Sequence, residues 1–236
     1  MIFMTFGRTF TFLGTGTSVG IPMVGCRCEV CRSTNPRNQR YRCSVLITTA
    51  KGNILIDTTP ELRLQLLREQ VERIDAVLFT HAHADHLHGL DDLRPFSAYT
   101  GQPIPLYCTE DVEQRIRTTF GYAFGSEAFP SKAYVPKLEV NRIAEEPFLL
   151  LDERITPIPL LHAGMTVHGF RIGGVAYCTD VSQIPGLGQV AGAELARLTG
   201  DGSTACAAPA WVQPIVAKPA AAAGFPAVIV QVGMSC

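Results

Sequence analysis

The sequence lacks the features that mark membrane-spanning, secreted and polyanion-binding chains. None of its apolar runs approaches the roughly 20 residues that a helix needs to cross a bilayer. The first residues carry Arg8 within an apolar stretch and no small-residue cleavage site, so we expect no secretory signal. The chain is almost neutral, with 20 Lys and Arg against 21 Asp and Glu, which gives no reason to expect a surface that binds nucleic acid. We therefore expect a cytoplasmic protein with neither a membrane nor a nucleic acid as its partner.

The last fifth of the chain also lacks most polar chemistry. Residues 186–236 hold only four charged residues, no histidine and 13 alanines, whereas residues 1–185 hold all six histidines and 11 alanines. We find no internal repeat and no linker between domains. The chain has 236 residues, 47% of them hydrophobic, which is enough for one large core. We expect a single domain over residues 1–236, with an atypical segment over residues 186–236.

Short apolar runs, bounded by turn residues, predict a series of strands. They cover residues 8–13, 45–49, 53–57, 76–80, 104–108, 155–160, 166–172 and 174–178. Two helices are expected between them, with Thr59 and Thr109 as their N-caps. In the first helix, one face is predicted to consist of Leu62, Leu66, Leu67 and Val71. This mixture predicts an α/β fold, with sheets packed together and helices outside.

Four of the six histidines lie within eight residues, directly after a strand of the buried type. The candidate ligands are His81, His83, Asp85 and His86. Imidazole and carboxylate groups are the ligands of cations such as zinc, manganese and iron. His81 and His83 are close enough in the chain to share a cation, which leaves Asp85 and His86 for a second. The pattern therefore predicts a site for one or two metal ions.

The segment HAHADH resembles the H-x-H-x-D-H signature of the metallo-β-lactamase superfamily, whose members are mostly hydrolases with one or two metals. The similarity to its PhnP-like branch, the phosphoribosyl cyclic phosphate phosphodiesterases, extends from residue 10 to about residue 185. It rests on GTGTSVGIPMVGCRCEVC, RCSVLI, ILIDT, HLHGLDDLRPF, PLLHAG and YCTDVS. The resemblance implies a four-layer αβ/βα sandwich with the site at the sheet edges.

The resemblance also implies a role for each candidate ligand. Two divalent cations, zinc or manganese, would be held by His81, His83 and His162, by Asp85 and His86, and by Asp180 as the bridge. Asp85 is then the candidate catalytic residue. Without the resemblance, His162 is equally well explained as a structural histidine. Asp57, at the end of an apolar strand, is expected to orient a ligand, and a turn-forming role is the alternative.

The implied chemistry is hydrolysis by metal-activated hydroxide. Two cations that share a water molecule lower its pKa from 15.7 to about 7 and neutralise the oxygens of a phosphate. The branch implies a small cyclic phosphate or another small phosphodiester as the substrate. Two alternatives stay open: a nuclease of the tRNase Z type, and a metal-binding protein of this fold that has lost catalysis. A homodimer is also left open.

Three clustered cysteines offer ligands for a structural zinc, which takes four. They are Cys26, Cys28 and Cys31. In the branch that the chain resembles, the fourth ligand is a histidine near the C-terminus, and Cys236 stands in its place here. We expect one zinc on these four cysteines, with reduced cysteines and no metal as the alternative. The scattered cysteines beside strands are expected to be buried as small hydrophobic residues: Cys43, Cys108 and Cys178.

The chain departs from the branch in its last segment. It has no histidine after His168, which we expect on a strand surface, and Gly233 stands where the branch has an active-site ligand. One explanation is a natural variant with a weakened second metal site. The other is a local disturbance of the reading frame, since another frame could encode a family-like sequence near residues 202–207. The coding DNA would decide between them.

Overall fold

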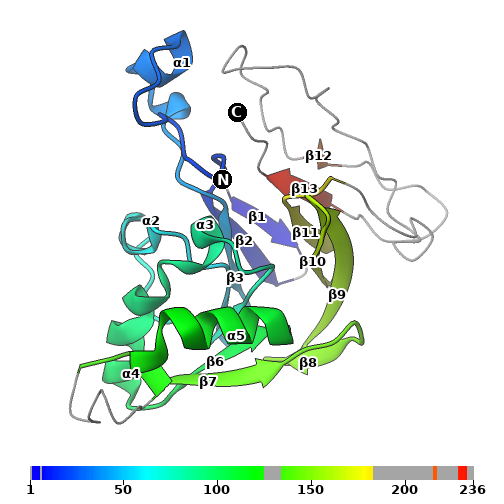
Figure 1. Cartoon of the computed structure of the whole chain (residues 1–236). Coiled ribbons are helices and arrows are strands. Elements are labelled where there is room, and N and C mark those ends of the chain that lie inside the picture. Colours follow the sequence, from blue (N-terminus) through cyan, green and yellow to red (C-terminus); the bar gives the residue numbers. More distant parts are fainter. Residues whose placement is uncertain (1, 6, 125–133, 183–214, 217–227, 233–236) are drawn as a thin grey trace, which may run out of the picture. The chain divides into compact units, whose positions relative to one another are not determined.

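The computed structural model describes residues 2–5, 7–124, 134–182, 215–216 and 228–232. The chain groups into two compact units, one formed by residues 1–14 and 42–144 and the other by residues 15–41 and 145–236. Each unit contains one β-sheet, and most of the strands are labelled in Figure 1. The expected single domain over the whole chain stays a prediction.

The first unit is built on a seven-stranded sheet in the order β1-β2-β3-β4-β5-β6-β7. The strands are β1 (Ile2–Thr5), β2 (Arg8–Gly14), β3 (Ser44–Thr48), β4 (Asn53–Ile56), β5 (Ala76–Leu78), β6 (Ile104–Cys108) and β7 (Leu138–Arg142). Strands β1 to β4 pair antiparallel, and β4 to β7 pair parallel. Parallel neighbours need long crossover connections. These connections carry α2 (Leu62–Arg68), α3 (Ala84–Leu87), η2 (Leu90–Leu93), α4 (Arg94–Thr100), α5 (Glu110–Thr119) and η3 (Gly121–Phe124).

The core of this unit is a row of apolar side chains that crosses the sheet. The strand register pairs Leu46 with Leu55, Leu55 with Val77, and Val77 with Leu106. Directly paired residues point to the same face of a sheet, so this row forms a continuous apolar stripe. The same buried cluster contains residues of three helices: Leu62 and Leu66 of α2, Leu87 of α3, and Val112 and Ile116 of α5. Burial of this stripe against the helices holds the ends of β4 and β5 in place.

The second unit has a six-stranded sheet in the order β12-β13-β11-β10-β9-β8. Its strands are β8 (Phe148–Leu150), β9 (Glu153–His162), β10 (Met165–Ile172), β11 (Val175–Thr179), β12 (Ile215–Val216) and β13 (Val228–Val232). Strands β8 to β11 form an antiparallel meander, and β13 joins β11 in parallel. The unit also contains α1 (Glu29–Arg32) and η1 (Pro36–Asn38). This part of the chain has its own small core around Leu160, Val167 and Cys178.

Most elements that the sequence predicts are present, with boundaries within about two residues. The mixed α/β class is confirmed, and the cysteines expected to be buried are Cys43 (2% exposed), Cys108 (0%) and Cys178 (3%). Thr109 is the N-cap of α5, although its hydroxyl contacts Asp111 rather than a backbone N–H. Among the described residues, no helix is long and apolar enough to cross a membrane.

Three details of the prediction are wrong. Thr59 is not the N-cap of α2, because its hydroxyl donates to Gln65 Oε1 at 3.0 Å and the helix begins only at Leu62. Leu67 is 60% exposed, because the buried face of the helix consists of Leu62, Gln65 and Leu66. His168 is 8% exposed rather than on a surface, because four consecutive residues of β10 are buried on both faces of the strand.

A pair of leucine variants tests which residues carry the core of the first unit. Leu106 is fully buried in the stripe, so Leu106→Ala is expected to reduce the free energy of unfolding by about 2–5 kcal/mol. Leu67→Ala removes the same atoms from an exposed position and should change that free energy by less than about 0.5 kcal/mol. Urea unfolding followed by circular dichroism measures both. Equal losses would contradict the described core.

Candidate metal centre

Strand β5 fixes the position at which the histidine motif begins. Its three residues are fully buried and pair with β4 on one side and β6 on the other. Beyond the strand, the Phe79 N–H donates to the Tyr107 carbonyl at 3.0 Å, and the Asp57 N–H donates to the Leu78 carbonyl at 2.9 Å. Both neighbouring strands therefore hold the backbone just before His81.

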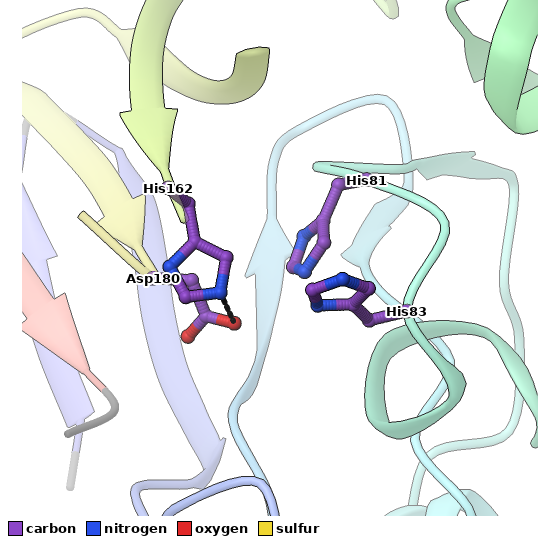
Figure 2. Close-up of side chains that lie close together, drawn as sticks. All are labelled: His81, His83, His162 and Asp180. Atoms are coloured by element: carbon purple, nitrogen blue, oxygen red, sulfur yellow. Dashed lines mark ion pairs between the residues drawn. The ribbon is translucent and has the colours of Figure 1, made fainter. Parts of the chain in front are cut away.

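The four predicted ligands of the motif lie together in the first unit. His81 and His86 are 3% and 1% exposed, with ring centroids 4.2 Å apart. The His83 ring lies 4.5 Å from that of His81, nearly perpendicular to it, and Figure 2 shows these two rings at the end of the strand. The one-turn helix α3 begins after His83 and places Asp85 Oδ2 at 3.3 Å from His86 Nε2. The short loop and the single helical turn thus bring His81 and His83 close together, and Asp85 close to His86.

Asp57 is a fully buried carboxylate that receives three hydrogen bonds. Its Oδ1 accepts from the Thr80 N–H at 2.8 Å, and its Oδ2 accepts from the Thr80 hydroxyl at 2.8 Å. His86 Nδ1 lies 2.7 Å from the same Oδ2. The Asp57 backbone has a φ of +63°, which most residues avoid but aspartate tolerates better than most. This conformation turns the Asp57 side chain, which directly follows β4, toward the motif.

A second set of hydrogen bonds joins the segment after β4 to helix α3. The Thr58 N–H donates to the His86 carbonyl at 2.7 Å, the Thr58 hydroxyl to the Leu87 carbonyl at 3.0 Å, and the Gly89 N–H to the Thr58 carbonyl at 2.9 Å. The two segments approach so closely that a Cβ at residue 89 would overlap the carbonyl oxygen of Thr59. Only glycine fits there, which explains the glycine in the sequence HLHG.

The second unit brings His162 and Asp180 together. His162 ends β9, and a tight turn at Ala163 and Gly164, both with positive φ, leads directly into β10. Asp180 follows β11 with a φ of +55°, and the Ser182 N–H then donates to the Leu161 carbonyl at 2.7 Å. As a result His162 Nε2 and Asp180 Oδ2 are 3.9 Å apart, the ion pair marked in Figure 2.

Cys26, Cys28 and Cys31 also lie together in the second unit, with their three Sγ atoms within 4.8 Å of one another. Cys28 is the N-cap of α1, and its Sγ accepts from the Cys31 N–H at 3.4 Å, while Cys31 Sγ accepts from the Met23 N–H at 3.4 Å. The Met23 N–H lowers the pKa of the Cys31 thiol, but burial and the two neighbouring thiols together raise it above its ordinary value. The fourth expected ligand, Cys236, lies outside the described residues, as does Gly233.

These donor sets fit divalent metals. Two ligands of a tetrahedral zinc, with bonds of about 2.0–2.2 Å, lie about 3.3–3.6 Å apart, and Asp85 and His86 already have that separation. His86 and His81 each use Nδ1 for a contact within the protein, with Asp57 and Thr80 respectively. Metal-binding histidines have this arrangement, in which one nitrogen is held by the protein and Nε2 takes the metal.

The sequence did not single out the threonines at these positions. Thr80 and Thr58 form several of the hydrogen bonds around the motif. In the sequence, they could have been found as threonines next to a buried strand, one before His81 and one after Asp57.

Two other residues near the motif have structural contacts rather than a place among the candidate ligands. His88 is exposed and packs against Phe120, and the guanidinium of Arg94 pairs with Asp91, as expected of a structural salt bridge.

Comparison with known proteins places these sites in a family context. A family model described as "Beta-lactamase superfamily domain" matches residues 52–207. A solved structure described as a new diphosphatase from the PhnP family is 40% identical, with a TM-score of 0.69, and the match covers 76% of this chain and 67% of that one. The structure of Zn²⁺-bound PqqB from Methylobacterium extorquens, at 22% identity, has a similar fold, with a TM-score of 0.56 over 72% of this chain and 61% of that one.

A curated relative is an octanoyltransferase of Porphyromonas gingivalis. It is 38% identical over 173 residues, which cover 73% of this chain and 34% of that protein. The chain therefore spans about a third of the length of this relative. The four-layer class implied by the resemblance agrees with these matches, since the solved relatives have the metallo-β-lactamase fold.

Removal of the Asp57 charge tests whether this carboxylate holds the motif for metal binding. Asp57→Asn keeps the shape of the side chain, but an amide cannot accept all three hydrogen bonds, so zinc affinity is expected to fall about 10–100-fold. Asp75→Asn is the matched control, because Asp75 also accepts a backbone N–H, from Asn53 at 2.8 Å, outside the motif. Competition with a chelating dye measures both affinities. Unchanged zinc affinity in Asp57→Asn would contradict the role.

Proposed function

Because the chain belongs to the metallo-β-lactamase superfamily and is PhnP-like, we propose that it is a metal-dependent hydrolase that cleaves a small phosphodiester. The observation that carries the proposal is the donor set His81, His83, Asp85 and His86. Within it, Nδ1 of His81 and Nδ1 of His86 are each held by a buried partner. The 40% identity to a PhnP-family diphosphatase supports a phosphate compound as the substrate class. A cyclic phosphate is the particular substrate that the branch suggests.

We assign the donors to two divalent cations, zinc or manganese. His81, His83 and His162 would hold the first, Asp85 and His86 the second, and Asp180 would bridge them. When bound, such a pair of cations lowers the pKa of a water molecule and neutralises phosphate oxygens. Asp85 is the candidate catalytic residue, since its carboxylate is partly exposed beside His86 and can both bind a cation and accept a hydrogen bond from water.

Asp57 contributes to this chemistry indirectly. It is fully buried, so it cannot meet a substrate, but its hydrogen bonds fix the His86 ring and the backbone before His81. The chain thus fixes the ligands before a metal binds, which removes the entropic cost of ordering them. We therefore propose the ligand-orienting role for Asp57, with a turn-forming role as the alternative.

We further propose a structural zinc on Cys26, Cys28 and Cys31, with Cys236 as the fourth ligand. The three thiols converge on one loop that is fixed at its base by the hydrogen bond from Gly16 N–H to the Tyr41 carbonyl at 2.7 Å. Zinc binds thiolates, so its charge would compensate the repulsion among three deprotonated cysteines.

A second candidate function is metal binding without catalysis. One observation favours it: the chain has no histidine after His168, so it lacks the late histidines of the branch that it resembles. A nuclease of the tRNase Z type is the third candidate in this test, although the balanced net charge argues against an affinity for a polynucleotide.

The test is metal content together with turnover of three substrates. The wild type, refolded or purified with zinc or manganese, is expected to bind about three metal ions and to hydrolyse bis(p-nitrophenyl) phosphate and a small cyclic phosphate, but not a precursor tRNA. Metal bound without any turnover would favour the second candidate. Cleavage of the tRNA alone would favour the nuclease. A protein that binds no metal after supplementation would exclude all three assignments.

Replacement of one ligand separates the active centre from the rest of the protein. His83→Ala is expected to lose about one metal ion and to lower kcat/KM by more than about 100-fold, because it removes a ligand of the first cation. His88→Ala removes a histidine from the same segment that contacts Phe120 instead, and should keep both metal content and activity. Plasma emission spectrometry counts the metals. Equal behaviour of the two variants would contradict the assignment.

The cysteine site has its own test. Cys28→Ser is expected to lose one zinc while the metals of the histidine centre stay bound, because the two sites share no ligand. Cys43→Ala removes a buried thiol outside the loop and should keep every zinc. If Cys28→Ser retains its full zinc content, the loop cysteines are reduced thiols without a metal.

A further inference from the structure

We propose that Thr80 is a positioning residue that relays the charge of Asp57 to His81 and so fixes which nitrogen of His81 carries the proton. The inference rests on the proposed metal site and goes beyond it, because it assigns a role to a residue that is not a ligand. Thr80 lies between the end of β5 and the motif, is 1% exposed, and contacts both groups.

The hydrogen bonds at Asp57 determine the direction of the others. An ionised carboxylate can only accept hydrogen bonds. Its Oδ2 lies 2.8 Å from Thr80 Oγ1 and 2.7 Å from His86 Nδ1, so both of these atoms must donate to it. The Thr80 N–H donates to Oδ1 at 2.8 Å. Asp57 therefore fixes a proton on His86 Nδ1 directly.

The next step is at the Thr80 hydroxyl, which has a single proton. That proton points to Asp57, so in the 2.9 Å contact with His81 Nδ1 the hydroxyl oxygen can only accept. His81 must then carry its proton on Nδ1. His81 thus donates to Thr80, and Thr80 donates to Asp57. Both directions follow because the Asp57 carboxylate can only accept.

The consequence is that both buried histidines present the same atom to a metal. With a proton on Nδ1, a neutral imidazole has its lone pair on Nε2, which is the form that binds a cation. One carboxylate sets this form in two ligands, in His86 by direct contact and in His81 through a hydroxyl. Loss of the hydroxyl should therefore affect His81 and leave His86 with its partner.

Burial prevents water from replacing these hydrogen bonds. Asp57, Thr80, His81 and His86 are between 0% and 3% exposed, so bulk water does not compete for their polar atoms. The Thr80 side chain also cannot turn away easily, because its own backbone N–H is bound to the other oxygen of the same carboxylate. Two contacts with one acceptor hold the residue in a single orientation.

The test uses the metal-free protein and the zinc-bound protein in turn. Thr80→Val removes the hydroxyl at nearly constant volume, Thr80→Ser keeps it, and Thr59→Val is the control, since Thr59 is another fully buried threonine whose hydroxyl bonds to Gln65. The metal-free protein is labelled at its histidine nitrogens, and long-range proton–nitrogen correlation spectra are recorded over a series of pH values. These spectra report the proton position on each ring.

We expect His81 of the wild type to carry its proton on Nδ1, and His81 of Thr80→Val to populate both forms while His86 is unchanged. In stepwise zinc titrations, Thr80→Val should weaken one binding event about 10–100-fold. Thr80→Ser keeps the hydroxyl, so His81 should carry its proton on Nδ1 and zinc should bind with about the affinity of the wild type. Thr59→Val should match the wild type in both measurements.

Three results would overturn the proposal: a wild-type His81 protonated on Nε2, a Thr80→Val variant that binds zinc like the wild type, or equal zinc loss in Thr80→Val and Thr59→Val. The first readout is made on the wild type without metal, so it decides even if Thr80→Val does not fold. It is also independent of the hydrolase proposal, which fails instead if the wild type binds no metal or shows no turnover.

Discussion

The buried carboxylate of Asp57 is the constraint on which the described metal motif depends. A charged group without exposure to water is costly unless every acceptor site is used, and here a backbone N–H, a hydroxyl and an imidazole N–H are supplied. All three donors belong to the segment that follows β5. The carboxylate at the end of one strand is therefore stable only when the motif at the end of the next strand has its described conformation.

The rest of the first unit maintains this arrangement. The parallel pairing of β4 and β5 places Asp57 and Thr80 at the same edge of the sheet, because the carboxyl ends of parallel strands coincide. Thr58 and Gly89 then hold helix α3 against the same edge. The second unit has a related solution, since Thr179 ends β11 and its hydroxyl donates to Asp180 Oδ1 at 3.2 Å. In both units a threonine at a strand end contacts the side chain of a candidate ligand or of its partner.

Much of this could be predicted from the sequence, because the elements depend on local patterns. The apolar runs predicted the strands. The cluster of His81, His83, Asp85 and His86 predicted the candidate ligands, because four donors on one short loop must lie close together. The roles of Thr80 and Thr58 could not be predicted, because threonine is common at strand ends and its partner is far away in the chain. The burial of His168 and the exposure of Leu67 depend on tertiary packing, which local periodicity does not contain.

The histidine-free tail affects the two proposed cations differently. In the proposed assignment the first cation has four protein donors, His81, His83, His162 and Asp180, none of which comes from the tail. The second has three, Asp85, His86 and the shared Asp180, because Gly233 has no side chain to replace the late ligand of the branch. In this assignment the missing ligand therefore weakens the second site, while the donors of the first cation stay complete.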